Sequence, residues 1–249
     1  MEELGYATLL MPDGLQLLSP LPALAVAASV TSRLRVGTFV LAGPLRPPGL
    51  AAWDAHSLSI LLDGRFELGI GTGRPEVVNQ AAELLGVPPA SSSQRLAQVE
   101  QTIDRLRDLD GERHTPVMIA AAGRKVRALA AAKADIVTLA GGPLASRDDI
   151  LQMTADLRAQ AGVRAEQIEL STNIFVIGDE VPPWMQQFLG TDAATLIAHD
   201  SLAMLRGNTA RQMADELLRR RDAFGVSHVS INSAFLEQMA PVVEMLAGR

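Results

Sequence analysis

The chain has 249 residues, of which 48% are hydrophobic, with a formal net charge of −6 and no cysteine. This is enough for one large domain with its own core, and the absence of cysteine excludes disulfides, thiolate metal ligands and a cysteine nucleophile. Scarce aromatic residues and dispersed basic residues argue against a nucleic-acid partner, and no apolar run approaches the roughly 18 residues of a membrane span.

Strands and helices are predicted to alternate along the whole chain. Residues 1–5 are typical of the last turn of a helix that ends at a glycine. Alternating strands and helices predict a parallel sheet, and the length fits a (β/α)8 barrel formed by residues 1–249 as a single domain. Strands are predicted at 6–11, 34–41, 66–71, 117–121, 135–139, 168–177 and 228–232, in sequential neighbour order, and helices at 21–31, 49–62, 76–85, 94–109, 123–133, 148–161, 210–224 and 234–246, with a helical excursion at 182–199.

The most informative stretch is residues 65–75, a strand that runs into a glycine loop. Hydrophobic residues alternate with Glu67 and Gly69, which is strand periodicity. Gly71 and Gly73 permit a positive φ and a close approach of the backbone, and a helix follows. Such a loop suits a phosphate, although the same spacing also fits a tight strand-to-helix turn without a ligand.

Taken in order, the motifs resemble the luciferase-like monooxygenase superfamily, and most of all its branch of oxidoreductases that depend on the deazaflavin coenzyme F420. The resemblance covers nearly the whole chain and is carried by residues 2–6, 12–13, 34–41, 62–73, 121–124 and 235–243. It implies a (β/α)8 barrel, often dimeric, in which a flavin or deazaflavin lies at the carboxyl ends of the strands. The first strand of that barrel has no counterpart here. We therefore expect a gap beside the last strand, closed by a partner chain or by repacked helices, and a homodimer.

The resemblance also assigns site residues. A helix N-terminus and a guanidinium would bind the cofactor phosphate, although Arg124 and Lys125 could equally be solvated first-turn residues. Asp13, at the end of a strand, is the leading catalytic acid or base, with a simple turn residue as the alternative. The expected cofactor-binding residues are Ala42, Gly43, Gly71, Thr72, Gly73, Ala122, Gly123, Arg124 and Lys125.

Three positions depart from the family pattern. Gly14 stands where the family has a histidine after Pro-Asp, Ala42-Gly43-Pro44 replaces polar residues, and Arg46-Pro47-Pro48 replaces Arg-His-Pro. Three hypotheses therefore stay open. The first is an oxidoreductase that uses F420 or FMN on a small organic substrate. The second is a barrel subunit without catalysis. The third is an enzyme that uses the pocket without a redox cofactor, with Asp13 as its acid or base.

The remaining candidates have two interpretations each. Trp184, Met185 and Phe188 could form a lid or could pack as an ordinary helix face. The triplet at 219–221 is expected on a solvated helix face. The four histidines show no metal-ligand spacing, so no metal site is expected, and His56 is taken as a packing or interface residue. A cytoplasmic location is expected.

Overall fold

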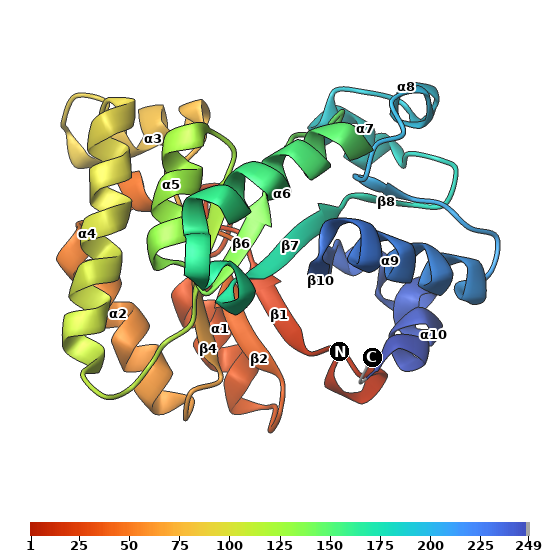
Figure 1. Ribbon diagram of the computed structural model, residues 1–249. Coiled ribbons are helices and arrows are strands. Elements are labelled where there is room, and N and C mark those ends of the chain that lie inside the picture. Colours follow the sequence, from red (N-terminus) through yellow and green to blue (C-terminus); the bar gives the residue numbers. More distant parts are fainter. Residues whose placement is uncertain (248–249) are drawn as a thin grey trace.

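The computed structural model describes residues 1–247 and shows parallel strands curved into a nearly closed barrel, with helices outside it (Figure 1). The strands follow the order β1-β2-β4-β5-β6-β7-β10, and β3 pairs with β4 beyond the end of β2. The predicted fold class and neighbour order are therefore confirmed. The barrel strands are β1 (Thr8–Met11), β2 (Arg35–Thr38), β3 (Leu41–Ala42), β4 (Phe66–Gly71), β5 (Val117–Ala121), β6 (Ile136–Leu139), β7 (Glu169–Ile174) and β10 (Val226–Ile231).

The helices begin where the sequence supplies caps. Ser91 and Ser146 each form a capping box with the residue three positions on, and Thr209 accepts a bond from Gln212. In residues 1–247 no helix is both long and apolar enough to cross a bilayer. The α-helices are α1 (Pro20–Ser29), α2 (Pro48–Leu61), α3 (Pro75–Leu85), α4 (Ser92–Asp110), α5 (Arg124–Lys133), α6 (Arg147–Ala161), α7 (Pro183–Leu189), α8 (Ala193–Ala198), α9 (Ala210–Phe224) and α10 (Leu236–Leu246), with short 3-10 turns η1 (Glu2–Leu4), η2 (Gly43–Leu45), η3 (Gly162–Gln167) and η4 (Ser233–Phe235).

Two predicted strands are wrong in their extent. The strand expected at 34–41 breaks after Thr38, because the chain turns into the barrel there and Thr38 Oγ1 donates to the Gly69 carbonyl at 2.6 Å. The strand expected at 168–177 ends at Ile174. Residues Val176–Ile177 form β8, which pairs with β9 (Met204–Leu205) in a separate two-stranded sheet. The expected excursion at 182–199 divides into α7 and α8.

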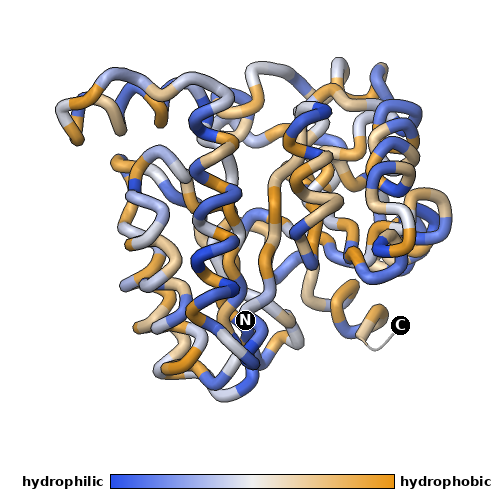
Figure 2. The backbone as a smooth tube through the Cα atoms, turned by 60° about the vertical axis from the view of Figure 1, so that its left-hand side comes forward, coloured by the Kyte–Doolittle hydropathy of each residue, from blue (hydrophilic) through white to orange (hydrophobic). Residues whose placement is uncertain are grey.

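The apolar residues gather in separate clusters. The main core lies between the strands β1 to β7 and the helices α1, α2, α4, α5 and α6. A second core lies under α9 and α10, and a third, small core lies between β8, β9, α7 and α8. Figure 2 shows the pattern behind this arrangement, since the strands are mostly hydrophobic whereas the outer helices alternate between hydrophobic and hydrophilic residues.

The expectation that the arginines at 219–221 lie on a solvated helix face is wrong for Arg220. Its side chain is buried, donates to the carbonyls of Leu202 at 3.0 Å and Met204 at 2.7 Å, and pairs with Glu216 at 2.9 Å. Buried guanidinium groups persist when their donors are satisfied in this way. Arg220 therefore fixes the base of the α7–α8 excursion to α9.

The sheet has two unpaired edges in the part of the chain that the structure describes. Strand β1 pairs only with β2 and β10 only with β7, so the expected gap is present between them (Figure 1). It is bridged at one end, where η1 packs on α10 and the Tyr6 hydroxyl donates to the Leu236 carbonyl at 2.7 Å. A three-residue turn thus bridges one end of the gap, and closure by a partner chain or by repacked helices stays a prediction.

The barrel interior holds a buried carboxylate, Glu67, on β4. Its side chain is 3% exposed, and Oε1 has no hydrogen-bond partner within residues 1–247. Burial raises the pKa of Glu67, while the positive charges of His228 and Arg35 oppose this shift and Glu169 adds to it. Its nearest cation, Arg35 Nε, lies 3.4 Å from Oε2. Glu67 is therefore less stable as a carboxylate in the folded protein than in the unfolded chain.

We expect Glu67→Gln to flatten the pH dependence of stability. A raised folded-state pKa means that stability is full below the ordinary value of 4.5 and is lost as pH rises through the folded-state pKa. The neutral amide removes this loss. Urea unfolding at pH 4 and pH 8 measures it, with the exposed Glu3→Gln as control. Equal pH slopes in wild type and Glu67→Gln would contradict the assignment.

Candidate functional site

The predicted site residues lie at the carboxyl ends of neighbouring strands. Asp13 follows β1, Ala42 ends β3, Gly71 ends β4, and Gly123 follows β5. Ala42 and Gly71 are direct register partners, and β4 pairs with β5. The structure thus brings together, along one edge of the barrel, segments that are up to 110 residues apart in sequence (13 to 123). This is where barrels of this type build their sites.

Asp13 holds two loops together. Its side chain is 3% exposed and receives two bonds from Arg46, Nη1 to Oδ2 at 2.5 Å and Nη2 to Oδ1 at 3.3 Å. Oδ2 also accepts the backbone N–H of Ala42 at 3.0 Å. Both carboxylate oxygens are therefore engaged, so that Asp13 fixes the loop after β1 to the loop after β3. Arg46 was not predicted as its partner, although both residues stand in family motifs.

The glycines of β4 make room for the protein's own backbone. A Cβ on Gly69 would lie 1.8 Å from the Thr38 carbonyl oxygen, and one on Gly71 would lie 2.8 Å from Val40 Cγ2. The segment that breaks the second strand therefore packs into the space that these glycines leave. Gly69 and Gly71 thus have a packing role within β4. Phosphate binding at residues 71–73 and the alternative of a tight turn without a ligand both stay predictions.

The start of α5 is open to solvent. Gly123 is its N-cap without a side-chain bond, and a Cβ there would meet nothing within 4 Å. Arg124 and Lys125 are exposed, and neither has an ion pair or a side-chain hydrogen bond within the described residues. The free N–H groups, the helix dipole and two unpaired cations together suit a phosphate group.

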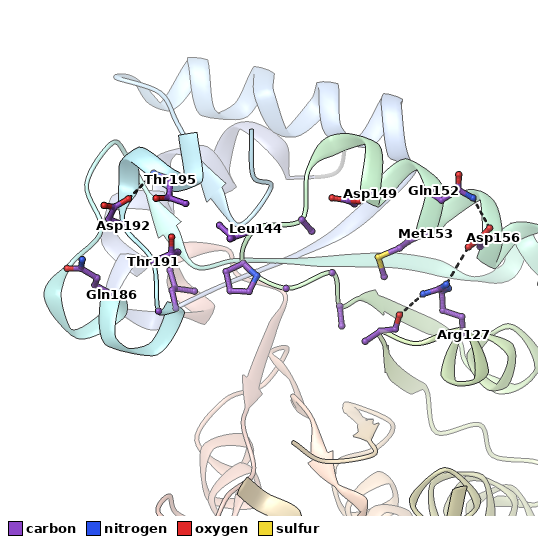
Figure 3. A pocket seen from close by; sticks show the side chains of 18 residues that line it. Arg127, Leu144, Asp149, Gln152, Met153, Asp156, Gln186, Thr191, Asp192 and Thr195 are labelled. Carbon is purple, nitrogen blue, oxygen red and sulfur yellow. Dashed lines mark hydrogen bonds and ion pairs between the residues drawn. The ribbon is translucent and has the colours of Figure 1, made fainter. Parts of the chain in front are cut away.

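A groove of about 1170 Å³ lies beside this helix start. Figure 3 shows its two walls: Asp149, Gln152, Met153 and Asp156 come from α6, and the facing side chains come from the α7–α8 segment. The loop after β6 forms the floor, and Ala122 lies at the edge near α5. Sequence reasoning missed this groove, because nothing local shows that α8 lies opposite α6. The facing residues are Gln186, Leu189, Gly190, Thr191, Asp192 and Thr195, and the floor is Ala140–Ala145.

The contacts of α7 agree with ordinary packing of a helix face, and its role as a lid stays a prediction. Met185 is buried in the small third core. Phe188, by contrast, lies 5.8 Å from Phe175, between ring centroids, and the Arg74 guanidinium carbon lies 5.5 Å from the Phe188 centroid. Trp184 contacts Phe235 with centroids 6.5 Å apart. Because Arg74 begins α3 just after the glycine loop, α7 reaches across to the residues that follow β4.

The histidines lie away from this edge or have structural partners. His56 Nδ1 lies 2.8 Å from Asp110, and His114 Nε2 lies 2.8 Å from Asp135, both near the amino ends of strands. This agrees with the interpretation of His56 as a packing residue. His228 contacts Ser171 at 2.9 Å inside the barrel. Within residues 1–247, no group of three acidic or histidine side chains could hold a metal ion.

The chain has relatives of known and unknown function. It is 39% identical over 98 residues to an uncharacterised protein of Mycobacterium tuberculosis (39% of this chain, 32% of the relative). It is 38% identical over 88 residues to a 4-hydroxyprotoasukamycin monooxygenase of Streptomyces nodosus subsp. asukaensis (35% and 23%). It is also 27% identical over 201 residues to an F420-dependent glucose-6-phosphate dehydrogenase of Nakamurella multipartita (68% and 58%). The matches thus span between about a quarter and three-fifths of these relatives' lengths.

Solved structures with the same fold cover nearly the whole chain. The F420-dependent tetrahydromethanopterin reductase of Methanopyrus kandleri has a TM-score of 0.72 at 16% identity, covering 97% of this chain and 90% of that one. A riboflavin lyase with modified FMN has a TM-score of 0.71 at 13% identity, covering 98% and 82%. At these identities the likeness establishes the fold alone. Residues 1–182 match the family of luciferase-like monooxygenases, so this chain belongs to that family of oxidoreductases.

Proposed function

We propose that the chain is an oxidoreductase that uses a deazaflavin or a flavin to act on a small organic molecule. The observation that carries this proposal is the open start of α5, with Arg124 and Lys125 unpaired within residues 1–247 at the carboxyl end of β5. Both cofactors carry a phosphate, and the donor set fits it. When bound, the cofactor ring supplies the hydride chemistry.

The residues around the proposed cofactor have distinct tasks. The N–H groups at the start of α5, with Arg124 and Lys125, bind the phosphate and so set the cofactor's position. We place the ring nearest to residues 71–73, at the end of β4. Ala42 and Gly43 are buried, and Ala42 packs with Leu45, Val77 and Ala81, so these two residues support the edge of the barrel.

The choice between F420 and FMN belongs to this proposal. The dehydrogenase relative and the methanogen reductase are F420-dependent enzymes, and the structure of the riboflavin lyase holds modified FMN. We therefore place F420 first and FMN second. A barrel subunit without catalysis stays an alternative, because Gly14 replaces a histidine of the family pattern and Ala42-Gly43 replaces polar residues. The cytoplasmic location expected from the sequence stays a prediction.

Arg124→Ala should weaken cofactor binding about ten- to a hundredfold, because one hydrogen bond to a charged group contributes about 1.5–3 kcal/mol. Titration calorimetry with F420 and with FMN measures this. Arg33→Ala is the control, since Arg33 is also exposed but lies at the opposite end of the barrel. Unchanged binding by Arg124→Ala would refute the phosphate assignment. If neither cofactor binds to wild type, the redox proposal yields to the cofactor-free alternatives.

The contacts of Asp13 bear on the cofactor-free alternative. An acid or base must exchange a proton with a substrate, and Asp13 instead uses both oxygens on Arg46 and Ala42. We therefore propose that Asp13 is a positioning residue for the loops after β1 and β3, and its catalytic role stays the weaker alternative.

Asp13→Ala should lower the free energy of unfolding by about 3 kcal/mol, because it leaves the largely buried guanidinium of Arg46 unpaired. The double variant Asp13→Ala/Arg46→Ala should lose less than the sum of the single losses. Urea unfolding of wild type, the two single variants and the double variant measures the coupling between Asp13 and Arg46 as a double-mutant cycle. If Asp13→Ala is as stable as wild type but inactive, the positioning role is wrong, and Asp13 is better described as the catalytic acid or base.

We also propose that the protein is a homodimer through α1 and α2, which pack on one another. Large apolar side chains on these helices face solvent: Val30 is 81% exposed, Trp53 60% and Leu61 75%, with Val26, Leu50 and Ile60 beside them. Large exposed apolar side chains on two packed helices are typical of an interaction surface, and an exposed tryptophan is a common binding hot spot.

Trp53→Asp should convert the dimer to a monomer, because a carboxylate would be buried in an apolar interface. Light scattering across micromolar concentrations measures the mass. Leu84→Asp, on α3 and similarly exposed, is the matched control and should stay dimeric. A wild type that is monomeric over the whole range would overturn the proposal.

A further inference from the structure

The glycine loop at residues 71–73 is held from outside the barrel by one side chain, that of Arg95. This residue lies in the first turn of α4 and is partly buried. Its Nε donates to the Thr72 carbonyl at 2.9 Å, and its Nη1 donates to the Ala90 carbonyl at 2.8 Å. Its Nη2 donates to the Ser92 hydroxyl at 3.3 Å. The direction agrees with helix geometry, because side chains of a helix lean toward its N-terminus.

These bonds join the two ends of an excursion of the chain. The chain leaves β4 at Thr72, forms α3, and returns through Ala90 just before α4 begins. One planar guanidinium therefore binds a carbonyl at each end of the excursion. Helix α4 is a firm support for it, because its start is capped by Ser91 and its length packs against α2. Arg95 thus fixes the glycine loop relative to the outer helices.

The bond to the Thr72 carbonyl also orients the N–H of Gly73. A trans peptide is planar, so its carbonyl and the N–H of the next residue point in opposite directions. Because the Thr72 carbonyl points to α4, the Gly73 N–H points away from α4, to the inner side of the loop. This N–H has no hydrogen-bond partner within residues 1–247, and Gly73 is only partly buried. Arg95 therefore presents one free donor on the inner side of the loop.

The loop has a second conformation that Arg95 opposes. Gly73 has a φ of 75°, and glycine adopts positive and negative φ about equally well. The peptide between Thr72 and Gly73 is therefore free to rotate and turn its carbonyl inward, unless another group holds it. Within the described chain, the bond from Arg95 is the hydrogen bond that the Thr72 carbonyl accepts. Its loss would replace a fixed donor by a mixture of donor and acceptor.

We propose that Arg95 is a positioning residue for the cofactor, because it holds this peptide so that the Gly73 N–H faces the ring. The proposal rests on the proposed function, since it requires the ring to lie beside residues 71–73. The rings of F420 and FMN both carry carbonyl oxygens, which accept hydrogen bonds from such a donor. A donor that is fixed in advance needs no ordering when the ring binds, so Arg95 contributes to affinity without touching the cofactor.

NMR relaxation of the protein without cofactor tests the hold on the loop. In Arg95→Met, which keeps the stem and loses the donors, the order parameters of the Thr72 and Gly73 amides should fall from about 0.85 to below about 0.6. Arg95→Lys keeps one charged donor and should lie between. Arg105→Met is the matched control, since Arg105 is an exposed residue of the same helix. Order parameters in Arg95→Met equal to those of wild type would overturn the proposal.

Titration calorimetry with F420 and with FMN tests the link to the cofactor. Arg95→Met should bind about three- to tenfold more weakly than wild type, as expected for one neutral hydrogen bond. Arg95→Lys should recover part of this loss, and Arg105→Met should bind as wild type does. The Gly73 amide proton should move downfield on binding in wild type and stay in place in Arg95→Met, which a loss of stability alone would not produce.

Two results separate this proposal from the proposed function. A mobile loop in Arg95→Met together with unchanged affinity would refute the positioning role while the cofactor assignment stands. A wild type that binds neither cofactor would refute the proposed function and, with it, the cofactor part of this proposal. The relaxation data, recorded without cofactor, decide separately whether Arg95 fixes the loop.

Discussion

The hydrogen-bonded ladder between parallel strands is the constraint on which the rest of the structure depends. Each strand can pair in parallel with the next only if the chain returns across the outside of the sheet, which the helices accomplish. All carboxyl ends then meet at one edge of the barrel. For this reason Asp13, Ala42, Gly71 and Gly123 lie along one edge although they are far apart in sequence.

Within this frame, the barrel edge is divided by charge. The open start of α5 carries two unpaired cations in the described chain, and the adjoining groove carries carboxylates. Positive and negative side chains therefore occupy neighbouring places along this edge. The glycines of β4 act on the other side of α5, where they let the chain at Thr38–Val40 pack against β4.

Much of the fold was predictable, because it depends on local pattern. Strands buried on both faces are short and apolar, and caps such as Ser91 and Ser146 mark helix starts. The break in the strand after Thr38 could not be predicted, because its cause is a contact with Gly69, 31 residues away. In the same way, the apolar run at 168–177 does not reveal that its last residues pair with Met204–Leu205.

The placement of the candidate segments at one edge of the barrel was predictable, because the end of each strand is visible in the sequence. Their role as a site stays a prediction. The contacts between these segments were not found, because the Asp13–Arg46 pair and the carboxylates of the groove bring together residues from separate elements. Arg220 shows the same limit: three consecutive arginines look alike in sequence, yet only the middle one faces the carbonyls of Leu202 and Met204.

The two unpaired edges of the sheet have a consequence for cooperativity. An inner strand such as β5 pairs on both sides, whereas β1 and β10 each pair on one side only in the described part of the chain. Opening an edge strand therefore breaks one ladder, and opening an inner strand breaks two. Because Phe224 and Val226 also tie α9 and β10 to the main core, we expect hydrogen exchange to begin at the sheet edges and to reach the centre last.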